Sequence, residues 1–429
     1  MPEVVKSTVT CDMEGRIETF NKGAEQIFLY KAEEVIGKKR VSLFSPGLIV
    51  LEHVPTWLKI ASEKGEFNTQ TVFLRKDGSA FAADIRITPT RNKDGRQVGY
   101  CGVTTARPHM EVAKAWPHVA LFTKVFSALV ITRAPFLTAT LIPVLIGAAW
   151  VAARGLATPF PWDLFGLVML GASAMHIAAN TFNDYFDWTS GTDKGNNDYF
   201  LPYSGGSRSI ELGLISEKNL LRLASAALAL AVAAGLAVLF LTGRVWLLAF
   251  GIFGVFSTYF YTAPPLRLAA RKGLGELLIG LNFGPLMVAG TVYALTGHLT
   301  SLEFLAGAPI GLLTTAILWI NEIPDLASDE LSGKLTLVVV LGQARARWGY
   351  LLILTLAFGL VIVGVGLGWF PVGALVMLLS LPVAYYTTRT LFQHYKDRAL
   401  VKANAATVQL HMLAGLLMAA GLLVGAMLG

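Results

Sequence analysis

Charged residues are scarce in this sequence, because Asp, Glu, Lys and Arg make up only 15% of its 429 residues. Soluble globular proteins contain about 25%, so the composition excludes a single large soluble domain. The deficit lies in one part of the chain. Residues 1–133 contain 33 charged residues, about a quarter of that part, whereas residues 134–429 contain 30, about a tenth. We therefore expect a soluble N-terminal part followed by a membrane part.

The sequence contains only two cysteines, has a small net charge and begins without an apolar run, and each of these features excludes a class of protein. The cysteines, Cys11 and Cys101, form no CxxC motif, which argues against a structural zinc site or a disulfide framework. The net charge of +7 is too small and too dispersed for a nucleic-acid interface. No apolar run typical of a signal peptide opens the sequence, so we expect the N-terminal part to be cytoplasmic.

Hydrophobic segments long enough to cross a bilayer recur from about residue 130. We predict nine spans, with eight or ten as alternatives where loops are short, near residues 131–152, 163–185, 219–241, 245–263, 274–296, 302–323, 347–367, 370–391 and 407–428. The predicted fold is therefore an α/β module followed by an all-α bundle of about nine transmembrane helices in a lipid bilayer.

The basic residues of the membrane part predict its orientation. With the N-terminus in the cytoplasm, the inner loops and span ends contain fourteen of its sixteen Lys and Arg, and the outer side keeps only Arg154 and Arg244. This distribution obeys the positive-inside rule. We therefore predict a multi-pass protein of the inner or plasma membrane, with its N-terminal domain in the cytoplasm.

The acidic residues of the membrane part gather in two clusters. Ten of its fourteen Asp and Glu lie at Asp184, Asp187, Asp193, Asp198, Glu211 and Glu217, and at Glu322, Asp325, Asp329 and Glu330. Each cluster begins at the cytoplasmic end of a predicted span, the second and the sixth. Because charge is costly in a membrane protein, such clusters mark a functional site.

Helical spacing places the polar residues of each cluster on one face, since residues three and four apart are neighbours. The first face contains His176, Asn180, Asn183, Asp184 and Asp187, and the second contains Asn321, Asp325 and Asp329. Facing carboxylates repel each other unless cations neutralise them. Mg²⁺ binds one or two carboxylates together with substrate phosphates. We therefore predict Mg²⁺ as a cofactor held by Asp184, Asp187, Asp325 and Asp329.

Basic residues lie beside both clusters. They are Arg133, Arg208, which follows a Gly-rich turn, Arg267, and Lys334. Arginine matches phosphate geometry, and a Gly-rich turn allows backbone N–H groups to approach it. Metal-binding carboxylates and cations at one membrane surface indicate a diphosphate whose apolar tail lies in lipid. The expected substrate is an isoprenyl diphosphate.

These residues resemble a known family. Asn183-Asp184-x-x-Asp187 and Asp325-x-x-x-Asp329 resemble the two aspartate-rich motifs of the UbiA superfamily of intramembrane prenyltransferases. The resemblance extends over about residues 129–429 and includes 261–267 (YTAPPLR) and 333–337 (GKLTL). It implies nine helices and the transfer of a prenyl chain from a polyprenyl diphosphate to an aromatic or other acceptor.

The third aspartate of the first motif separates branches of this superfamily. The 4-hydroxybenzoate and haem branches usually place it where this chain has Gly191. Here the third aspartate is Asp193, two residues further on. This spacing is similar to that of the 1,4-dihydroxy-2-naphthoate prenyltransferases of menaquinone biosynthesis, and the resemblance implies that Asp193 is also a metal ligand. However, Pro324 before Asp325 departs from the Arg-Asp common in that branch. We therefore expect 1,4-dihydroxy-2-naphthoate as the acceptor, with 4-hydroxybenzoate or another quinone or lipid precursor as the alternative.

A mechanism follows from these assignments. The catalytic residues Asp184, Asp187, Asp325 and Asp329 hold Mg²⁺ on the diphosphate. Ionisation of the C–O bond gives an allylic cation, which Phe186 and Tyr261 shelter and the acceptor ring attacks. The dominant catalytic effect is electrostatic stabilisation of the departing diphosphate. The predicted substrate-binding residues are Asn183, Arg133, Arg208, Tyr261, Arg267, Asn321 and Lys334.

The N-terminal part reads as a mixed α/β module over residues 8–105. Apolar residues alternate over 81–88, which predicts a half-buried strand between turns at Asp77-Gly78 and Asp94-Gly95. The segments 14–17, 21–25, 33–37 and 75–78 resemble a PAS domain, a ligand sensor or dimerisation unit. The implied partner is an unknown small ligand or a second copy. A flavin-binding cysteine motif is missing, so we predict no covalent flavin, and His53 is expected to be structural.

The predicted domains are a PAS-like sensor at 1–107, a linker or interfacial segment at 108–128 and a prenyltransferase domain at 129–429. Two other classes remain as alternatives. One is an ion-coupled membrane transporter and the other a PAS-gated sensor without catalysis. Transporters bury coupling carboxylates near the bilayer midplane, whereas the clusters here lie at helix ends, which favours an enzyme.

Overall fold

The computed structural model describes residues 5–191 and 206–428. The chain forms two compact units. The α/β unit contains Met1–Ile131 together with Arg208–Ser216, and the helical unit contains Thr132–Ser207 and Glu217–Gly429.

The α/β unit is built on a five-stranded antiparallel sheet in the order β2-β1-β5-β4-β3. The strands are β1 Lys6–Asp12, β2 Ile17–Phe20, β3 Phe67–Leu74, β4 Ala80–Arg91 and β5 Gln97–Ala106. The strand predicted over 81–88 is the middle of β4, which pairs with β3 and β5. At the predicted first turn, Gly78 has a φ of +82°, and Asp77 accepts a hydrogen bond from the Ser79 N–H, so this prediction is confirmed.

Short helices complete the α/β unit. They are α1 Lys22–Phe28, α2 Ala32–Val35, η1 Val41–Phe44, α3 Gly47–Glu52, α4 Val54–Lys64, α5 Val112–Ala115 and α6 Leu121–Ile131. Phe28 lies at the centre of an aromatic core, with its ring 4.3 Å from that of Phe44 and 5.7 Å from that of Phe73. His53 lies between α3 and α4, stacks on Trp57 and contacts the carbonyl of His118. These contacts agree with a structural role for His53.

The α/β unit also includes a segment from much later in the sequence. Arg208–Ser216 belongs to this unit, and Leu212 in it is buried. The segment lies so close to Gly47 that a Cβ at this glycine would be 2.0 Å from the carbonyl oxygen of Leu212. Only a residue without a side chain fits at the start of α3.

The helical unit is all α. Its elements are η2 Ala134–Phe136, α7 Thr138–Ala153, α8 Trp162–Ser190, α10 Glu217–Thr242, α11 Leu247–Phe260, η3 Leu268–Ala270, α12 Leu274–Leu281, η4 Asn282–Leu286, α13 Met287–Thr296, α14 Ser301–Leu331, α15 Leu337–Leu341, α16 Gln343–Gly366, η5 Val372–Ser380, α17 Leu381–His394, η6 Arg398–Leu400 and α18 Val401–Leu428.

Eight helical segments in the described residues are long and apolar enough to cross a membrane. Eight of the nine predicted spans fall on these segments. The ninth, predicted over 245–263, corresponds to α11, an apolar helix of only 14 residues. At 1.5 Å per residue a helix of this length is about 21 Å long, shorter than the hydrocarbon core.

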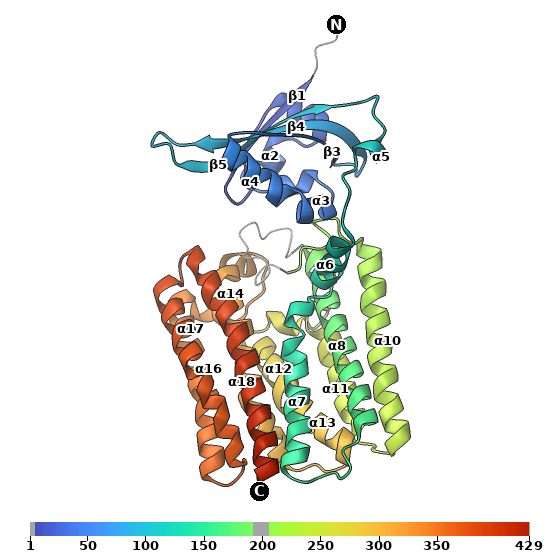
Figure 1. Ribbon diagram of the computed structural model, residues 1–429, viewed down its shortest axis with the longest axis vertical. Coiled ribbons are helices and arrows are strands. Elements are labelled where there is room, and N and C mark those ends of the chain that lie inside the picture. The colour runs from blue at the N-terminus through green and yellow to red at the C-terminus, as the bar shows by residue number, and fades with distance from the viewer. Residues whose placement is uncertain (1–4, 192–205, 429) are drawn as a thin grey trace. The chain divides into compact units, whose positions relative to one another are not determined.

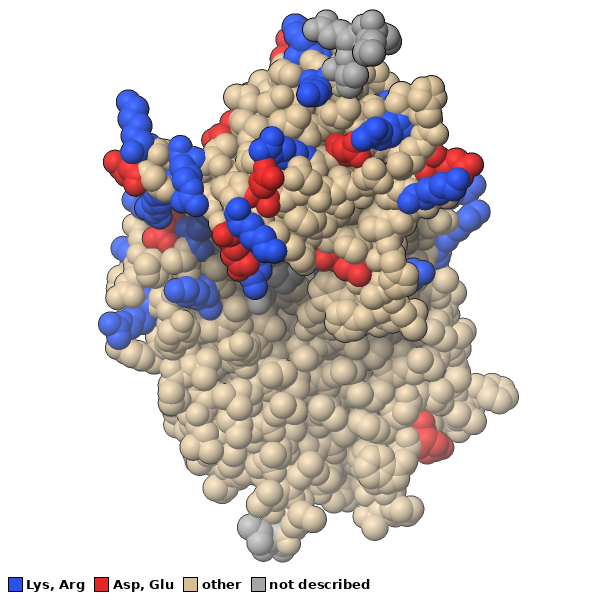
Figure 2. Space-filling view, turned by 45° about the horizontal axis from the view of Figure 1, so that its top comes forward, with Lys and Arg blue, Asp and Glu red and all other residues tan. Residues whose placement is uncertain are grey.

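Helices distant in sequence pack side by side in the bundle. The last helix, α18, packs against α7 and α14, and α8 packs against α10 (Figure 1). Glycines allow the closest approach, since a Cβ at Gly284 in η4 would lie 2.5 Å from the carbonyl oxygen of Gly307 in α14. Small residues at such crossings are typical of membrane helices. The face of the bundle in Figure 2 is almost free of charged side chains, as a lipid-facing surface requires.

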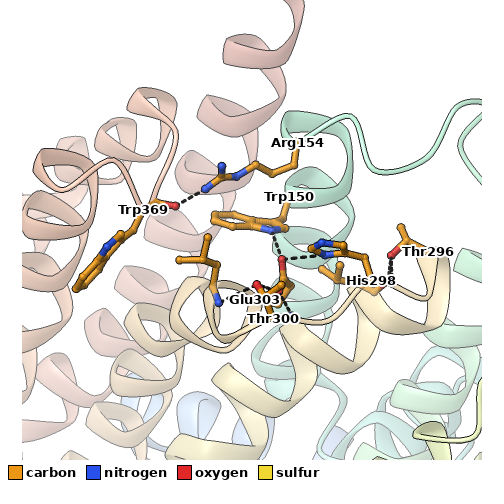
Figure 3. Close-up of polar contacts among 9 residues, drawn as sticks. Trp150, Arg154, Thr296, His298, Thr300, Glu303 and Trp369 are labelled. Carbon is orange, nitrogen blue, oxygen red and sulfur yellow. Dashed lines mark hydrogen bonds and ion pairs between the residues drawn. The ribbon is translucent and has the colours of Figure 1, made fainter.

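The start of α14 is fixed by a polar network shown in Figure 3. Thr300 and Glu303 form a capping box, and the buried carboxylate of Glu303 accepts a hydrogen bond from Trp150 Nε1 at 3.2 Å. His298 Nδ1 lies 3.5 Å from the same carboxylate. The network joins α14 to α7 about 39 Å along α14 from Asp329. It therefore stabilises the end of the bundle opposite the acidic clusters.

Candidate active site

The four aspartates of the two motifs lie near the ends of two long helices. The α8 helix runs to Ser190 and contains Asp184 and Asp187, and α14 runs to Leu331 and contains Asp325 and Asp329. Asp184 and Asp329 are buried, whereas Asp187 and Asp325 are half-buried. The rigid helical backbone therefore sets the spacing of each pair.

Two groups contact the carboxylate of Asp184, both at the oxygen Oδ1. Its carboxylate forms an ion pair with Arg133, and its Oδ1 lies 3.4 Å from the backbone N–H of Ser207. The second oxygen, Oδ2, is buried and accepts no hydrogen bond from the described residues. A buried carboxylate oxygen without a donor is a favourable ligand for a cation.

Asp329 interacts with Lys334, which follows α14 after a tight turn. Lys334 Nζ lies 3.5 Å from Asp329 Oδ2, and the Lys334 N–H donates to the Asp329 carbonyl at 2.8 Å. Gly333 makes the turn with a φ of +72°, a conformation that glycine adopts without strain. The turn brings the ammonium group back over the end of its own helix.

Lys334 also connects the two acidic clusters. Burial disfavours its charge, but Asp329 and Asp187 outweigh this effect and hold the pKa of Lys334 above its usual range. Tyr261, at the end of α11, belongs to the same electrostatic environment, and Arg267 acts on Asp187. The charged and polar groups at the ends of α8, α11 and α14 therefore share one electrostatic environment around this lysine.

Two loops are joined beside Lys334. Arg271 and Leu335 form a parallel β-bridge, and the Lys272 N–H donates to the Leu335 carbonyl at 2.7 Å. The loop that contains Arg267 is thereby fixed against the loop that contains Lys334. This pairing positions two of the predicted diphosphate-binding cations together.

The predicted arginines share an uncommon backbone conformation. Five non-glycine residues in the described part have positive φ. Three of them are Arg133, Arg208 and Arg267, with φ values of +50°, +54° and +43°. Residues other than glycine in this region store strain of about 1–3 kcal/mol, and such strain concentrates at functional sites. The conformation singles out three of the four predicted diphosphate-binding cations.

A cavity of about 340 Å³ opens next to these residues. One face of α8 follows it from Asn183 to Leu167, a length of about 24 Å. Most of its polar lining residues come from the half nearer the acidic clusters, and they are His176, Asn180, Asn183, Ser257, Thr258, Tyr261 and Asn282, with Thr140 bonded to His176. The lining farther along is mostly apolar, with Val168, Val238, Leu247 and Ala294, and its polar member is Thr291. The cavity therefore suits a molecule with a polar head and a long apolar tail.

Some predicted site residues make other contacts in the structure. The amide oxygen of Asn321 accepts a hydrogen bond from Asn404 of α18 at 2.8 Å, which fixes two helices to each other. Arg208 is part of the α/β unit and forms an ion pair with Glu211 at 3.0 Å. Asp193 lies outside the described residues. Among the described residues no three His, Cys, Asp or Glu side chains form a ready metal cluster.

Two buried carboxylates lie beside these residues although the sequence assigned neither of them a role; Glu322 was noted only as a member of the second acidic cluster. Glu276 of α12 accepts a hydrogen bond from the Leu337 N–H at 2.6 Å, so it anchors the end of the Lys334 loop. Glu322 of α14 lies near Glu276 and Lys334. An isolated glutamate inside an apolar segment marks a functional position in a membrane protein, and this pattern could have identified Glu276.

The fold and the cavity define an integral membrane protein with its polar groups at one end of an apolar chamber. Residues 140–411 match the model of the UbiA prenyltransferase family, and residues 5–105 match a PAS domain model. The chain therefore belongs to the UbiA prenyltransferase family. The predicted family, the PAS-like module and the fold class are confirmed.

The relatives match about two thirds of the chain. The chain is 27% identical over 298 residues to the 1,4-dihydroxy-2-naphthoate octaprenyltransferase of Bacillus subtilis, covering 68% of this chain and 91% of the relative. It is 28% identical over 292 residues to the 2-carboxy-1,4-naphthoquinone phytyltransferase of a Synechocystis strain, covering 67% and 90%. The apo structure of a UbiA homolog from Aeropyrum pernix K1 has a TM-score of 0.52 at 18% identity, covers 66% of this chain and 97% of that chain, and shows the same fold.

Proposed function

We propose that this protein transfers a polyprenyl chain from an allylic polyprenyl diphosphate to 1,4-dihydroxy-2-naphthoate, with Mg²⁺ assisting the loss of diphosphate. The observation that supports this proposal most directly is that Asp184, Asp187, Asp329 and Lys334 lie close together, next to Asn183 and Tyr261, which line the polar end of an apolar cavity. The polar end suits the diphosphate and the acceptor, and the apolar length suits the prenyl tail.

The carboxylates that would hold Mg²⁺ are Asp184, Asp187, Asp325 and Asp329, with Asp193 as a further ligand. The buried and unsatisfied Oδ2 of Asp184 supports this assignment. Bound Mg²⁺ would supply positive charge that neutralises the departing diphosphate. The protein positions these oxygens on two rigid helix ends, so that little reorganisation is needed during the reaction.

The cations bind and orient the diphosphate in this proposal. Arg133, Arg267 and Lys334 lie within reach of the carboxylates, and Arg208 would join them from the segment that follows the first motif. Asn183 and Tyr261 line the polar end of the cavity and would contact the substrates. Asn321 holds α14 to α18 and would act by positioning Asp325.

The reaction comprises three bond changes. The allylic C–O bond breaks, and its electron pair leaves with the diphosphate. The electron-rich ring of the acceptor then forms a C–C bond to the allylic carbon, and the attacked ring carbon loses CO₂ or a proton, whose bonding electron pair restores the aromatic ring. Half-buried Phe186, stacked on Phe182 and edge-on to Tyr259, belongs to an aromatic cluster beside this end of α8 that favours a cationic intermediate.

The acceptor assignment rests on the relatives named above and on the place of Asp193 in the sequence. The second candidate acceptor is 4-hydroxybenzoate or another quinone or lipid precursor, because Pro324 departs from the pattern of the naphthoate branch. An ion-coupled transporter is disfavoured by the position of Asp184 and Asp329 at helix ends. The distribution of basic residues supports a cytoplasmic N-terminal unit in this proposal.

We assign residues 1–107 as a PAS-like sensor that takes a small ligand or pairs with a second copy, and residues 108–128 as a linker or interfacial segment. Residues 129–429 form the prenyltransferase domain. With this division, a signal sensed in the cytoplasm would act on lipid synthesis in the membrane.

The test is product analysis with the full-length protein in lipid vesicles. Geranylgeranyl diphosphate and Mg²⁺ are supplied with 1,4-dihydroxy-2-naphthoate or with 4-hydroxybenzoate, and pyrophosphate release and lipid mass are measured. A prenylated naphthoquinol product supports the proposal, and a prenylated hydroxybenzoate would move the assignment to the other branch. No pyrophosphate release with either acceptor would overturn it.

A further inference from the structure

Glu276 is a buried carboxylate that the proposed mechanism does not use. It lies in the first turn of α12, inside a segment long and apolar enough to cross a membrane, and the residue is only 4% exposed. Its oxygen Oε2 is buried and has no hydrogen-bond partner among the described residues. A buried carboxylate is costly unless it is paired, and an acidic residue in a membrane segment marks a functional position whose partner must be identified.

The partner of Glu276 is the start of α15. Its oxygen Oε1 accepts a hydrogen bond from the Leu337 N–H at 2.6 Å. Leu337 is the first residue of this helix, so its N–H has no acceptor within the helix. The hydroxyl of the N-cap residue Thr336 accepts the bond from the Val339 N–H at 3.2 Å and leaves the Leu337 N–H to Glu276. The carboxylate therefore fixes the first residue of α15 to α12.

The start of α12 holds the short segment 335–337 at two backbone points. The Lys272 N–H donates to the Leu335 carbonyl at 2.7 Å, and Glu276 binds the Leu337 N–H two residues further along. Gly273 lies between these two contacts, and a Cβ there would be 3.7 Å from the Leu337 side chain. The segment 335–337 is therefore packed directly on the start of α12.

Lys334 lies one residue before this segment. Its own N–H donates to the Asp329 carbonyl at 2.8 Å, and its Nζ lies 3.5 Å from Asp329 Oδ2. The backbone is therefore held on both sides of Lys334, by α14 before it and by α12 after it. Without the bond to Glu276, the segment 335–337 can shift, and the ammonium group loses its fixed distance from Asp329.

We propose that Glu276 is a positioning residue for Lys334, which it holds over Asp329 by binding the backbone of the segment 335–337. The inference rests on the proposed function, because Lys334 is one of the cations assigned to the diphosphate. Glu276 does not line the cavity, so its effect passes through Lys334. Its partner is a neutral N–H group, so the role needs an acceptor oxygen at this position and not a negative charge.

The first experiment separates the acceptor oxygen from the charge. The kcat and the KM for geranylgeranyl diphosphate are measured with full-length Glu276→Ala and Glu276→Gln in lipid vesicles. We expect Glu276→Ala to raise the KM about tenfold and to change kcat less than about twofold, because an interaction lost equally from the ground state and the transition state raises only the KM. Glu276→Gln keeps an acceptor oxygen and should retain a KM near that of the wild type.

The matched control is Leu277→Ala. Leu277 is the next residue on α12, is 56% exposed and does not line the cavity. Truncation of its side chain changes the same helix without touching the bond to the Leu337 N–H, so both the kcat and the KM should stay at the wild-type values.

A double-mutant cycle with Lys334→Met tests the path of the effect. If Glu276 acts through Lys334, Glu276→Ala adds no further increase in KM once Lys334 is replaced, because coupled residues are not additive. A side chain that only stabilised the bundle would have the same effect in both backgrounds. Effects on the KM that multiply, an unchanged KM in Glu276→Ala, or an equal loss in Glu276→Gln and Glu276→Ala would overturn the inference.

Glu276→Asp provides the test if the alanine variant does not fold. It keeps the charge but shortens the side chain by one methylene, so the carboxylate withdraws from the Leu337 N–H. We expect a several-fold higher KM, and a wild-type KM would overturn the inference. Equal KM values for Lys334→Met and the wild type would overturn the role of Lys334 and this inference with it, whereas no pyrophosphate release by the wild type would overturn the proposed function itself.

Discussion

Arg133 and Asp184 form an ion pair across 51 positions of sequence. Arg133 precedes the first helix of the bundle, and Asp184 lies near the end of α8. The pair places a candidate phosphate-binding cation on a candidate metal ligand before any substrate is bound. Binding of Mg²⁺ to Asp184 would free the guanidinium for the diphosphate.

Replacing one carboxylate in each motif tests this arrangement. We expect Asp184→Asn and Asp325→Asn each to lower kcat/KM for prenyl transfer at least about 100-fold, because an amide is a poor ligand for Mg²⁺. Pyrophosphate release across a Mg²⁺ titration measures the effect. Asp163→Asn, at an exposed position in the first turn of α8, is the control. Near wild-type turnover in both motif variants would refute the assignment.

Lys334 is expected to bind the diphosphate as a permanent cation. Because Asp329 and Asp187 keep its pKa above the ordinary value despite burial, Lys334 remains protonated from pH 6 to pH 9. Lys334→Met should raise the KM for the diphosphate roughly tenfold, the effect of losing a charged hydrogen bond, and Lys334→Arg should retain most of the affinity. The wild-type profile of kcat/KM should show no decline from lysine deprotonation below about pH 9. Equal KM values for the methionine variant and the wild type would contradict this role.

The network at the start of α14 predicts a change in stability without a change in chemistry. Trp150→Phe leaves the buried Glu303 carboxylate without one donor, which should cost about 1–3 kcal/mol. Thermal unfolding of the detergent-solubilised protein should show a lower Tm, while the KM for the diphosphate stays the same. Trp162→Phe, at a 72% exposed position, should leave the Tm unchanged. A raised KM in Trp150→Phe would show that this end of the bundle affects the site.

The cysteines of the α/β unit report on its folding. Burial raises the pKa of the Cys11 thiol to about 12, so at pH 8 about one molecule in ten thousand has the thiolate. Cys101 is less buried. At pH 8 a maleimide should therefore modify Cys101 first, and Cys11 only after denaturation, as mass spectrometry of peptides would show. Equally fast labelling of both would contradict the packing of β1.

The sequence predicted those parts of the site in which acidic residues recur at the spacing of an α-helix. Asp184 with Asp187, and Asp325 with Asp329, are separated by helical intervals, so their common faces follow from the α-helical repeat. Both acidic clusters could be recognised because other charged residues are scarce in residues 134–429. The alternation over 81–88 likewise predicted the position of β4.

Other features depend on tertiary packing and have no local pattern. Asn404 and Asn321 meet only because α18 packs beside α14. The cavity is formed by small residues on several helices, and its length is set by their packing. The short α11 helix was predicted as a full span because the apolar residues of 245–263 continue beyond its ends at Leu247 and Phe260.

The place of Arg208–Ser216 has a consequence for dissecting this protein. The α/β unit is discontinuous along the chain, because it takes nine residues from between α8 and α10. A truncated chain that begins at residue 129 would keep Leu212 but lose the surface around Gly47 that buries it. Replacing the PAS domain with another module would therefore require redesign of that inserted segment as well. Removing the N-terminal residues alone would leave behind a part of the α/β unit's own packing.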